Sequence, residues 1–68
     1  MITLKAARIN KSYTQEKAAK LIGVSTDTLR KYERGETYPT VPIISRIEVV
    51  YGLGYNDIIF SRKNTVKP

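Results

Sequence analysis

The chain has 68 residues, no cysteine, no histidine and a formal net charge of +6. This length allows one small domain, and the missing cysteines and histidines exclude disulfides and the common zinc sites. Because the sequence has neither a run of about 18 apolar residues nor a signal-peptide core, we expect a soluble, cytoplasmic protein without a membrane partner.

The first predicted element is a helix over residues 1–11. Its apolar spacing predicts a core-facing side: Leu4, Ala7 and Ile9. Arg8 lies on this same apolar side, which is unusual for a solvated charge. A turn follows over 10–12, and we expect Tyr13 to pack beneath the next helix as a hydrophobic staple.

Two short helices joined by a tight turn are predicted next. Thr14 is a suitable N-cap for a helix over 15–22, a stretch that contains two alanines and neither glycine nor proline. Gly23 ends that helix, because glycine enters the left-handed conformation without steric cost. Ser25 caps a second helix over 26–34. Each helix has an apolar side for burial against the other: Ala18, Ala19 and Ile22 on the first, and Val24, Leu29 and Tyr32 on the second.

The C-terminal part predicts a loop, a longer helix and a short final element. Gly35 ends the second short helix, and the loop 36–40 follows. Pro42 suits the first turn of the longer helix, which ends at Gly52. Helical spacing predicts its buried stripe: Val41, Ile44, Ile47, Val50 and Tyr51.

A short fifth helix or turn is expected over 55–60, with Ile58 and Ile59 closing the core. Residues 61–68 are polar and basic, and we expect them to form a disordered tail beyond a single domain at 1–60.

Charge is distributed unevenly along the chain. Residues 1–34 carry a net charge of +5, residues 35–60 carry −2, and residues 61–68 carry +3. The side of the 26–34 helix left over for solvent combines three cations, one anion and a hydroxyl: Thr26, Asp27, Arg30, Lys31 and Arg34. Two short helices with such a face are typical of a DNA-binding helix-turn-helix, which indicates a polyanionic partner.

The sequence resembles the lambda-repressor/Cro-like family, also called XRE, over about residues 3–60. The resemblance rests on these stretches: Thr14-Gln15, Ala18-Ala19, Ile22-Gly23-Val24-Ser25, Leu29, Tyr32-Glu33-Arg34-Gly35, Tyr38-Pro39-Thr40-Val41-Pro42, Ile47-Glu48, Tyr51-Gly52 and Tyr55-Asn56-Asp57-Ile58-Ile59-Phe60. It implies an all-α, compact five-helix DNA-binding domain with the helix-turn-helix at its second and third helices. Gly54 stands where this family often has a serine cap, which predicts a weaker start for the fifth helix.

By resemblance, the second helix of the motif enters the major groove, and its base-reading positions are Thr26, Asp27 and Lys31, with Ser25 beside them. The chemistry suits this role, because Lys31 can donate to guanine, Asp27 can accept from cytosine N4 and Thr26 can touch a thymine methyl. Two alternatives stay open: Asp27 can simply favour the helix dipole, and Lys31 can contact phosphate only.

The resemblance also implies contacts to the DNA backbone. Gln15 matches a family glutamine that anchors a phosphate at a helix N-terminus, the alternative being an ordinary solvated residue. Further expected phosphate contacts are Arg30, Arg34, Thr37 and Tyr38, together with Thr28, which either faces the preceding helix or a phosphate. The tail 61–68 could add non-specific affinity.

In the resembled family, an arginine at the position of Arg8 pairs with a glutamate near the end of the recognition helix, which here is Glu33. We therefore expect a buried Arg8–Glu33 ion pair that ties the first helix to the third. The alternative is that Arg8 is a phosphate-binding residue on the surface.

These features predict a sequence-specific transcriptional regulator of double-stranded DNA, a Cro-like or small repressor of the kind found in phages or prophages. A homodimer on an inverted repeat is expected, because one helix-turn-helix covers only a few base pairs. Ile43 and Val49 are apolar where exposure is predicted, and together with Pro42 or the segment 55–60 they are candidate dimer residues. The alternative is partial burial against the tail or a loop. The alternative function is a protein-interaction module such as an antitoxin. Without histidine, cysteine or a visible acid–base pair, we expect no enzyme, cofactor, metal or small-molecule ligand.

Overall fold

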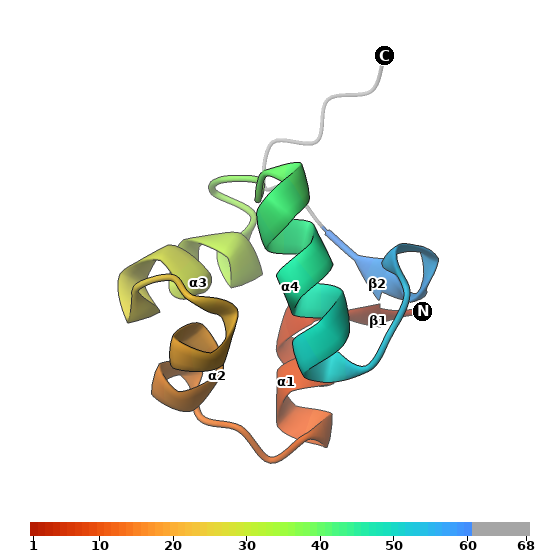
Figure 1. The fold of residues 1–68 in the computed structure, drawn as a ribbon, viewed down its shortest axis with the longest axis horizontal. Helices are drawn as coiled ribbons and strands as arrows, with labels where there is room; N and C mark the ends of the chain where they lie inside the picture. Colours follow the sequence, from red (N-terminus) through yellow and green to blue (C-terminus); the bar gives the residue numbers. More distant parts are fainter. Residues whose placement is uncertain (61–68) are drawn as a thin grey trace.

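The structure, a computed structural model, describes residues 1–60. Its elements in chain order are β1 (Ile2–Thr3), α1 (Leu4–Asn10), α2 (Gln15–Ile22), α3 (Thr26–Arg34), α4 (Val41–Tyr51), the 3-10 turn η1 (Tyr55–Asp57) and β2 (Ile58–Ile59). Figure 1 shows α2 and α3 on one side of α4 and the two strands on the other. The tail expected to be disordered lies outside the described residues.

The boundaries of α2 and α3 are set by capping side chains. The hydroxyl of Thr14 accepts a hydrogen bond from the backbone N–H of Lys17 at 3.0 Å, and Ser25 accepts one from Thr28 at 3.0 Å. Gly23 ends α2 with φ 95°, a conformation that a side chain would strain. The predicted bounds of these two helices are confirmed. They could be predicted because each cap acts on backbone groups within one helical turn of itself.

The core lies between α2, α3 and α4. Ile22, Leu29 and Ile47, one from each of these helices, are fully buried. Ala18 and Ala19 are also buried, and their small side chains allow the helices to approach closely. Tyr13 packs against this core with its ring 6.4 Å from that of Tyr51. None of the helices in the described part of the chain has the length and apolar character that crossing a bilayer requires.

The first predicted helix is too long at both ends, since α1 covers only Leu4–Asn10. Residues Ile2–Thr3 are extended instead and pair in parallel with Ile58–Ile59, with Ile2 opposite Ile58. The hydroxyl of Thr3 accepts a hydrogen bond from the N–H of Ala6 at 3.1 Å and so fixes the start of α1. The fold was expected to be all-α, but residues near its two ends pair to form a two-stranded parallel sheet.

The fifth helix is not present as an α-helix in residues 1–60. Its place is taken by the single turn η1, in which the carboxylate of Asp57 accepts a hydrogen bond from the N–H of Gly54 at 3.2 Å. The chain then extends into β2, because pairing with β1 satisfies its backbone groups. The structure thus has four helices and a 3-10 turn where five helices were predicted.

Some predicted core positions are exposed. Val41, assigned to the buried stripe of α4, is 75% exposed and is the first residue of that helix, one turn before the first buried residue, Ile44. Ile9 is exposed on α1. Ile59 is exposed beside buried Ile58, since successive strand residues point to opposite faces. Ile43, predicted to be exposed, is partly buried against the core.

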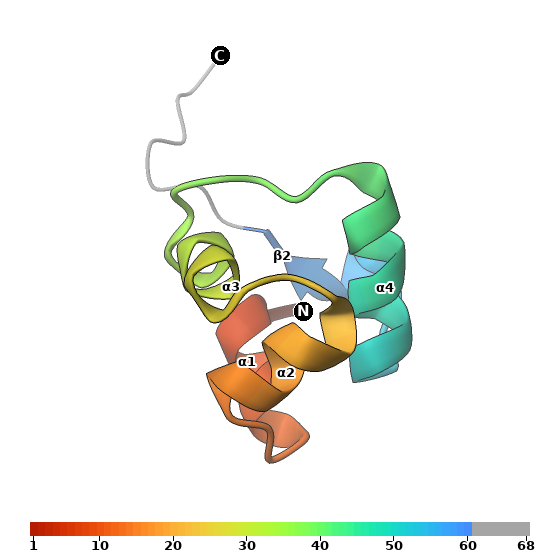
Figure 2. The same ribbon diagram turned by 60° about the vertical axis from the view of Figure 1, so that its left-hand side comes forward.

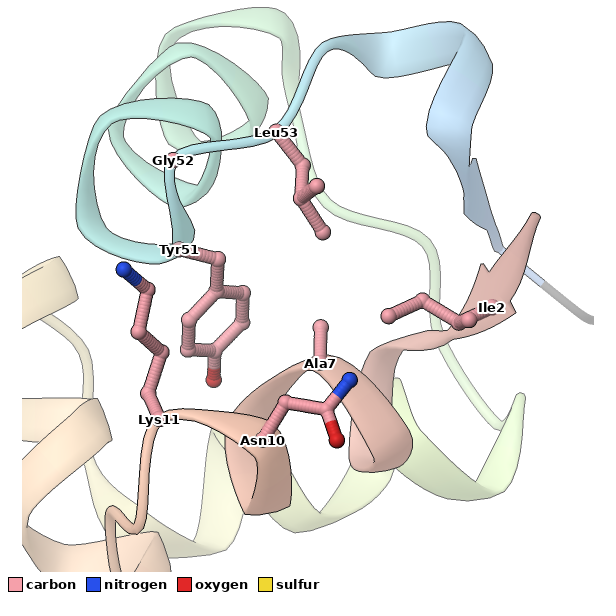
Figure 3. A pocket seen from close by; sticks show the side chains of 7 residues that line it. All are labelled: Ile2, Ala7, Asn10, Lys11, Tyr51, Gly52 and Leu53. Atoms are coloured by element: carbon pink, nitrogen blue, oxygen red, sulfur yellow. The ribbon is translucent and has the colours of Figure 1, made fainter.

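Tyr51, the last residue of α4, is buried against α1. Figure 3 shows its side chain pointing from α4 toward α1, between the side chains of Lys11 and Ala7. The hydroxyl is buried and has no hydrogen-bond partner within residues 1–60. Burial raises the pKa of this hydroxyl to about 12, and the negative charge of Glu33 adds to the shift.

This raised pKa predicts a loss of stability at alkaline pH. The folded state favours the neutral phenol, so the contribution of Tyr51 is fully present below pH 10 and is lost as the pH rises from 10 to about 12. At about pH 11, wild-type protein should lose about 1 kcal/mol more stability than Tyr51→Phe, which lacks the titrating group. Urea unfolding of both proteins at neutral and alkaline pH measures the difference. An equal loss in both would contradict the prediction.

Candidate nucleic-acid interface

One side of α3 is buried and the opposite side is open to solvent. Leu29 fixes the inner side in the core. The outer side is partly or fully exposed and contains the polar residues expected there: Thr26, Asp27, Arg30, Lys31 and Arg34. The helix therefore presents a rigid polar face to the surroundings.

The cations of this face are paired with carboxylates of the same chain. Arg30 lies 2.9 Å and Lys31 lies 3.6 Å from the two carboxylate oxygens of Asp27. Arg34 lies 2.8 Å from Glu36, directly after the glycine that ends α3. The pairing of Arg34 with Glu36 was not predicted, because residues two apart do not face each other on a helix and the contact forms only where Gly35 ends α3.

The first turn of α3 is organised by two hydroxyls. Ser25 accepts the N–H of Thr28 and donates its own hydroxyl to that of Thr28 at 2.8 Å. The prediction left Thr28 facing either α2 or a phosphate. The structure shows its hydroxyl bonded to the N-cap, at the end of α3 that carries Thr26 and Asp27.

An open hollow of about 410 Å³ lies where the N-terminal turns of α2 and α3 meet. Its lining combines two cations with hydroxyls, an amide and one carboxylate: Arg8, Thr14, Gln15, Glu16, Thr26 and Arg30. The N-terminal turn of a helix presents free N–H groups and the positive end of its dipole. The hollow is thus chemically suited to an anion such as a phosphate group.

Arg8, Gln15 and Glu33 form one hydrogen-bonded network beneath this hollow. The guanidinium of Arg8 donates to both carboxylate oxygens of Glu33, at 2.7 and 3.3 Å. Gln15 donates its amide N–H to the same carboxylate at 3.0 Å, and Arg8 also donates to the carbonyl of Tyr13 at 3.0 Å. The expected Arg8–Glu33 ion pair is present. Although Arg8 lines the hollow, it is only 9% exposed and its guanidinium is paired with Glu33, so the alternative of a surface phosphate-binding residue does not fit.

The contact of Gln15 with Glu33 was missed, since eighteen residues separate them and no local pattern connects them. It holds the Gln15 side chain in a fixed direction at the first turn of α2. The network consequently joins α1, α2 and α3, the elements that surround the hollow.

The loop after α3 contains the other two expected contact residues. Figure 2 shows this connection, residues 35–40, crossing one end of the molecule from α3 to α4. Thr37 is exposed there. The hydroxyl of Tyr38 lies 2.8 Å from that of Tyr55, and its ring packs edge-on against Phe60 at 5.7 Å. Tyr38 is thereby held in place by the C-terminal segment.

The three candidate dimer residues lie on α4. Val49 is 82% exposed, as predicted, whereas Ile43, for which exposure was also predicted, is partly buried against the core. Pro42 is exposed. Val49 also lines a shallow apolar hollow with Leu21 of α2.

Four packed helices with an exposed, charged third helix after a tight turn define a helix-turn-helix protein. The comparison with known families agrees, because a helix-turn-helix family model matches residues 4–58. The chain therefore belongs to this XRE-type family of lambda-repressor/Cro-like helix-turn-helix proteins. No curated protein matches the chain closely enough to be compared with it. The family assignment makes the chain a DNA-binding protein of the transcription-regulator type.

Proposed function

We propose that residues 1–60 form a sequence-specific regulator that binds double-stranded DNA with α3 in the major groove. The observation that carries this proposal is the outward polar face of α3, fixed from behind by buried Leu29. A major groove about 12 Å wide accommodates one α-helix, and the first residues of that helix then reach the base edges.

The proposed base contacts come from the first turns of α3: Ser25, Thr26, Asp27 and Lys31. Lys31 donates to guanine O6 or N7, and Asp27 accepts from cytosine N4. Thr26 contacts a thymine methyl or donates to a purine. The carboxylate of Asp27 supports its part by its place, since its side chain is 64% exposed on the side of α3 that would face the groove.

The proposed phosphate contacts surround these residues: Gln15, Thr28, Arg30, Arg34, Thr37 and Tyr38. Gln15 and Arg30 line the hollow at the α2 N-terminus, which fits a phosphate beside the groove. Thr37 and Tyr38 follow the C-terminal end of α3, where the backbone of a bound duplex would pass next. Phosphate contacts of this kind fix the orientation of the protein without reading sequence.

We further propose that the protein acts as a small, Cro-like repressor and binds an inverted repeat as a homodimer. The exposed apolar side chains of Val41 and Val49 on α4 support a contact between copies, with Pro42 and Ile43 beside them. The same surface also suits a different protein partner, as in an antitoxin. Co-purification of such a partner would favour that second function.

Selection of bound sequences from a random duplex pool tests the proposal. The expected result is a consensus of two inverted half-sites, with centres about 10 base pairs or a multiple of that apart. Sedimentation on the selected duplex should then show two copies bound. Enrichment of no sequence would overturn specific binding, and a single copy on a single half-site would overturn only the dimer.

A further inference from the structure

The cations on the outward face of α3 are already paired with carboxylates of the chain itself, three cations with two carboxylates. The carboxylate of Asp27 contacts Arg30 through one oxygen and Lys31 through the other, at 2.9 and 3.6 Å. Its side chain is 64% exposed, so it lies in the surface that would face a duplex. No other carboxylate in residues 1–60 contacts two cations.

The fold does not require this arrangement. Exposed ion pairs three and four residues apart on a helix add little to stability, because water and salt screen them. Leu29 and the Ser25 cap already fix this part of α3. The position of Asp27 therefore matters mainly for the binding of a polyanion such as a DNA duplex.

A duplex that approaches α3 brings phosphates toward the same two cations. Either Arg30 and Lys31 leave Asp27 to contact the DNA, or Asp27 stays between them as a negative charge beside the phosphates. Both events weaken binding to any duplex, whatever its sequence. Only a base that donates a hydrogen bond in the major groove, such as the exocyclic amine of cytosine, compensates the displaced carboxylate.

We propose that Asp27 is a specificity-determining residue whose carboxylate lowers the affinity of α3 for non-cognate duplexes by holding Arg30 and Lys31. This inference rests on the proposed function, in which α3 faces DNA. In this inference, Asp27 both contacts one base of the cognate site and disfavours binding to other sequences. Specific binding commonly combines attractive contacts to the right partner with repulsion of the wrong ones.

The test compares Asp27→Asn with wild type on a labelled random-sequence duplex and on the duplex selected by wild type, at several salt concentrations. Loss of one negative charge lets about one more phosphate be neutralised, so the salt slope of log K should steepen by about 1. Random-duplex binding should tighten about tenfold at about 0.1 M salt. Binding to the selected duplex should stay equal or weaken, so the specificity ratio falls at least tenfold.

Two further variants keep the result specific to this site. Glu48→Gln removes the same charge from α4 and should change random-duplex binding less than about twofold. Asp27→Glu keeps the negative charge beside Arg30 and Lys31, so it should tighten random-duplex binding less than Asp27→Asn does. Circular dichroism of each variant checks that the helices are retained.

The outcomes separate this inference from the proposed function. If wild type binds the duplexes and Asp27→Asn binds random DNA no tighter than Glu48→Gln does, the inference is wrong and the DNA-binding function stands. If Asp27→Asn weakens binding to both duplexes equally, the inference is also wrong, because the carboxylate then contributes to the binding of every duplex and opposes none. If neither wild type nor Asp27→Asn binds any duplex, both proposals are overturned.

Discussion

Replacing Glu33 by leucine should lower the free energy of unfolding by about 3–5 kcal/mol, because it leaves the buried guanidinium of Arg8 without its counter-charge. The side chains of Arg8 and Glu33 are only 11% and 4% exposed, so water replaces the lost partner only in part. Gln15 would lose its acceptor as well. Urea unfolding monitored by circular dichroism measures the effect.

The double variant Arg8→Met with Glu33→Leu tests whether the two residues act as a pair. It should be clearly less destabilised than the two single variants summed, because neither charge is then left buried alone. Lys5→Met, an exposed lysine on the same helix as Arg8, is the matched control and should change stability by no more than about 0.5 kcal/mol. Additive effects of the two single variants would show that the pair is not coupled.

Replacing Lys31 by alanine should weaken binding to the selected duplex by about 1–3 kcal/mol, or about fivefold to 150-fold. The reason is the loss of a donor to one base edge, so preference should relax at one position of the consensus and persist elsewhere. Repeating the duplex selection with the variant measures this directly. An unchanged consensus would assign Lys31 to phosphate contact alone.

Gln15→Ala provides the contrasting case among the proposed contacts. A residue that binds a phosphate should weaken the selected and the random duplexes alike and leave the consensus unchanged. Because Gln15 also donates to Glu33, thermal unfolding of the variant must accompany the binding measurement. Lys5→Ala removes a charge from α1, outside the proposed interface, and should affect both duplexes little.

Much of the helical framework was predictable because its signals are local. Thr14 and Ser25 cap helices through N–H groups three residues away, and Gly23 ends α2 through its own backbone conformation. The ends of the chain were predicted less well. A strand of two residues has no periodicity of its own, and Ile2 becomes extended only because Ile58 pairs with it.

The candidate site shows the same division. Helical spacing was enough to place Asp27 and Lys31 together on the outward side of α3. The Arg8–Glu33 pair was expected from the family resemblance, because twenty-five residues separate its members. The contact of Gln15 with that pair, and the hollow formed by the N-terminal turns of α2 and α3, had no sequence signal.

The sequence by itself determined the helix-turn-helix, its caps, its buried apolar sides and the charge of the face that α3 presents, since these depend on residues within a turn or two of one another. Only the tertiary structure decided that the N-terminus pairs with residues 58–59, that Val41 is exposed and that the carboxylate of Glu33 accepts hydrogen bonds from both Arg8 and Gln15. Those features depend on how separate helices pack, and packing brings together residues that local spacing does not relate.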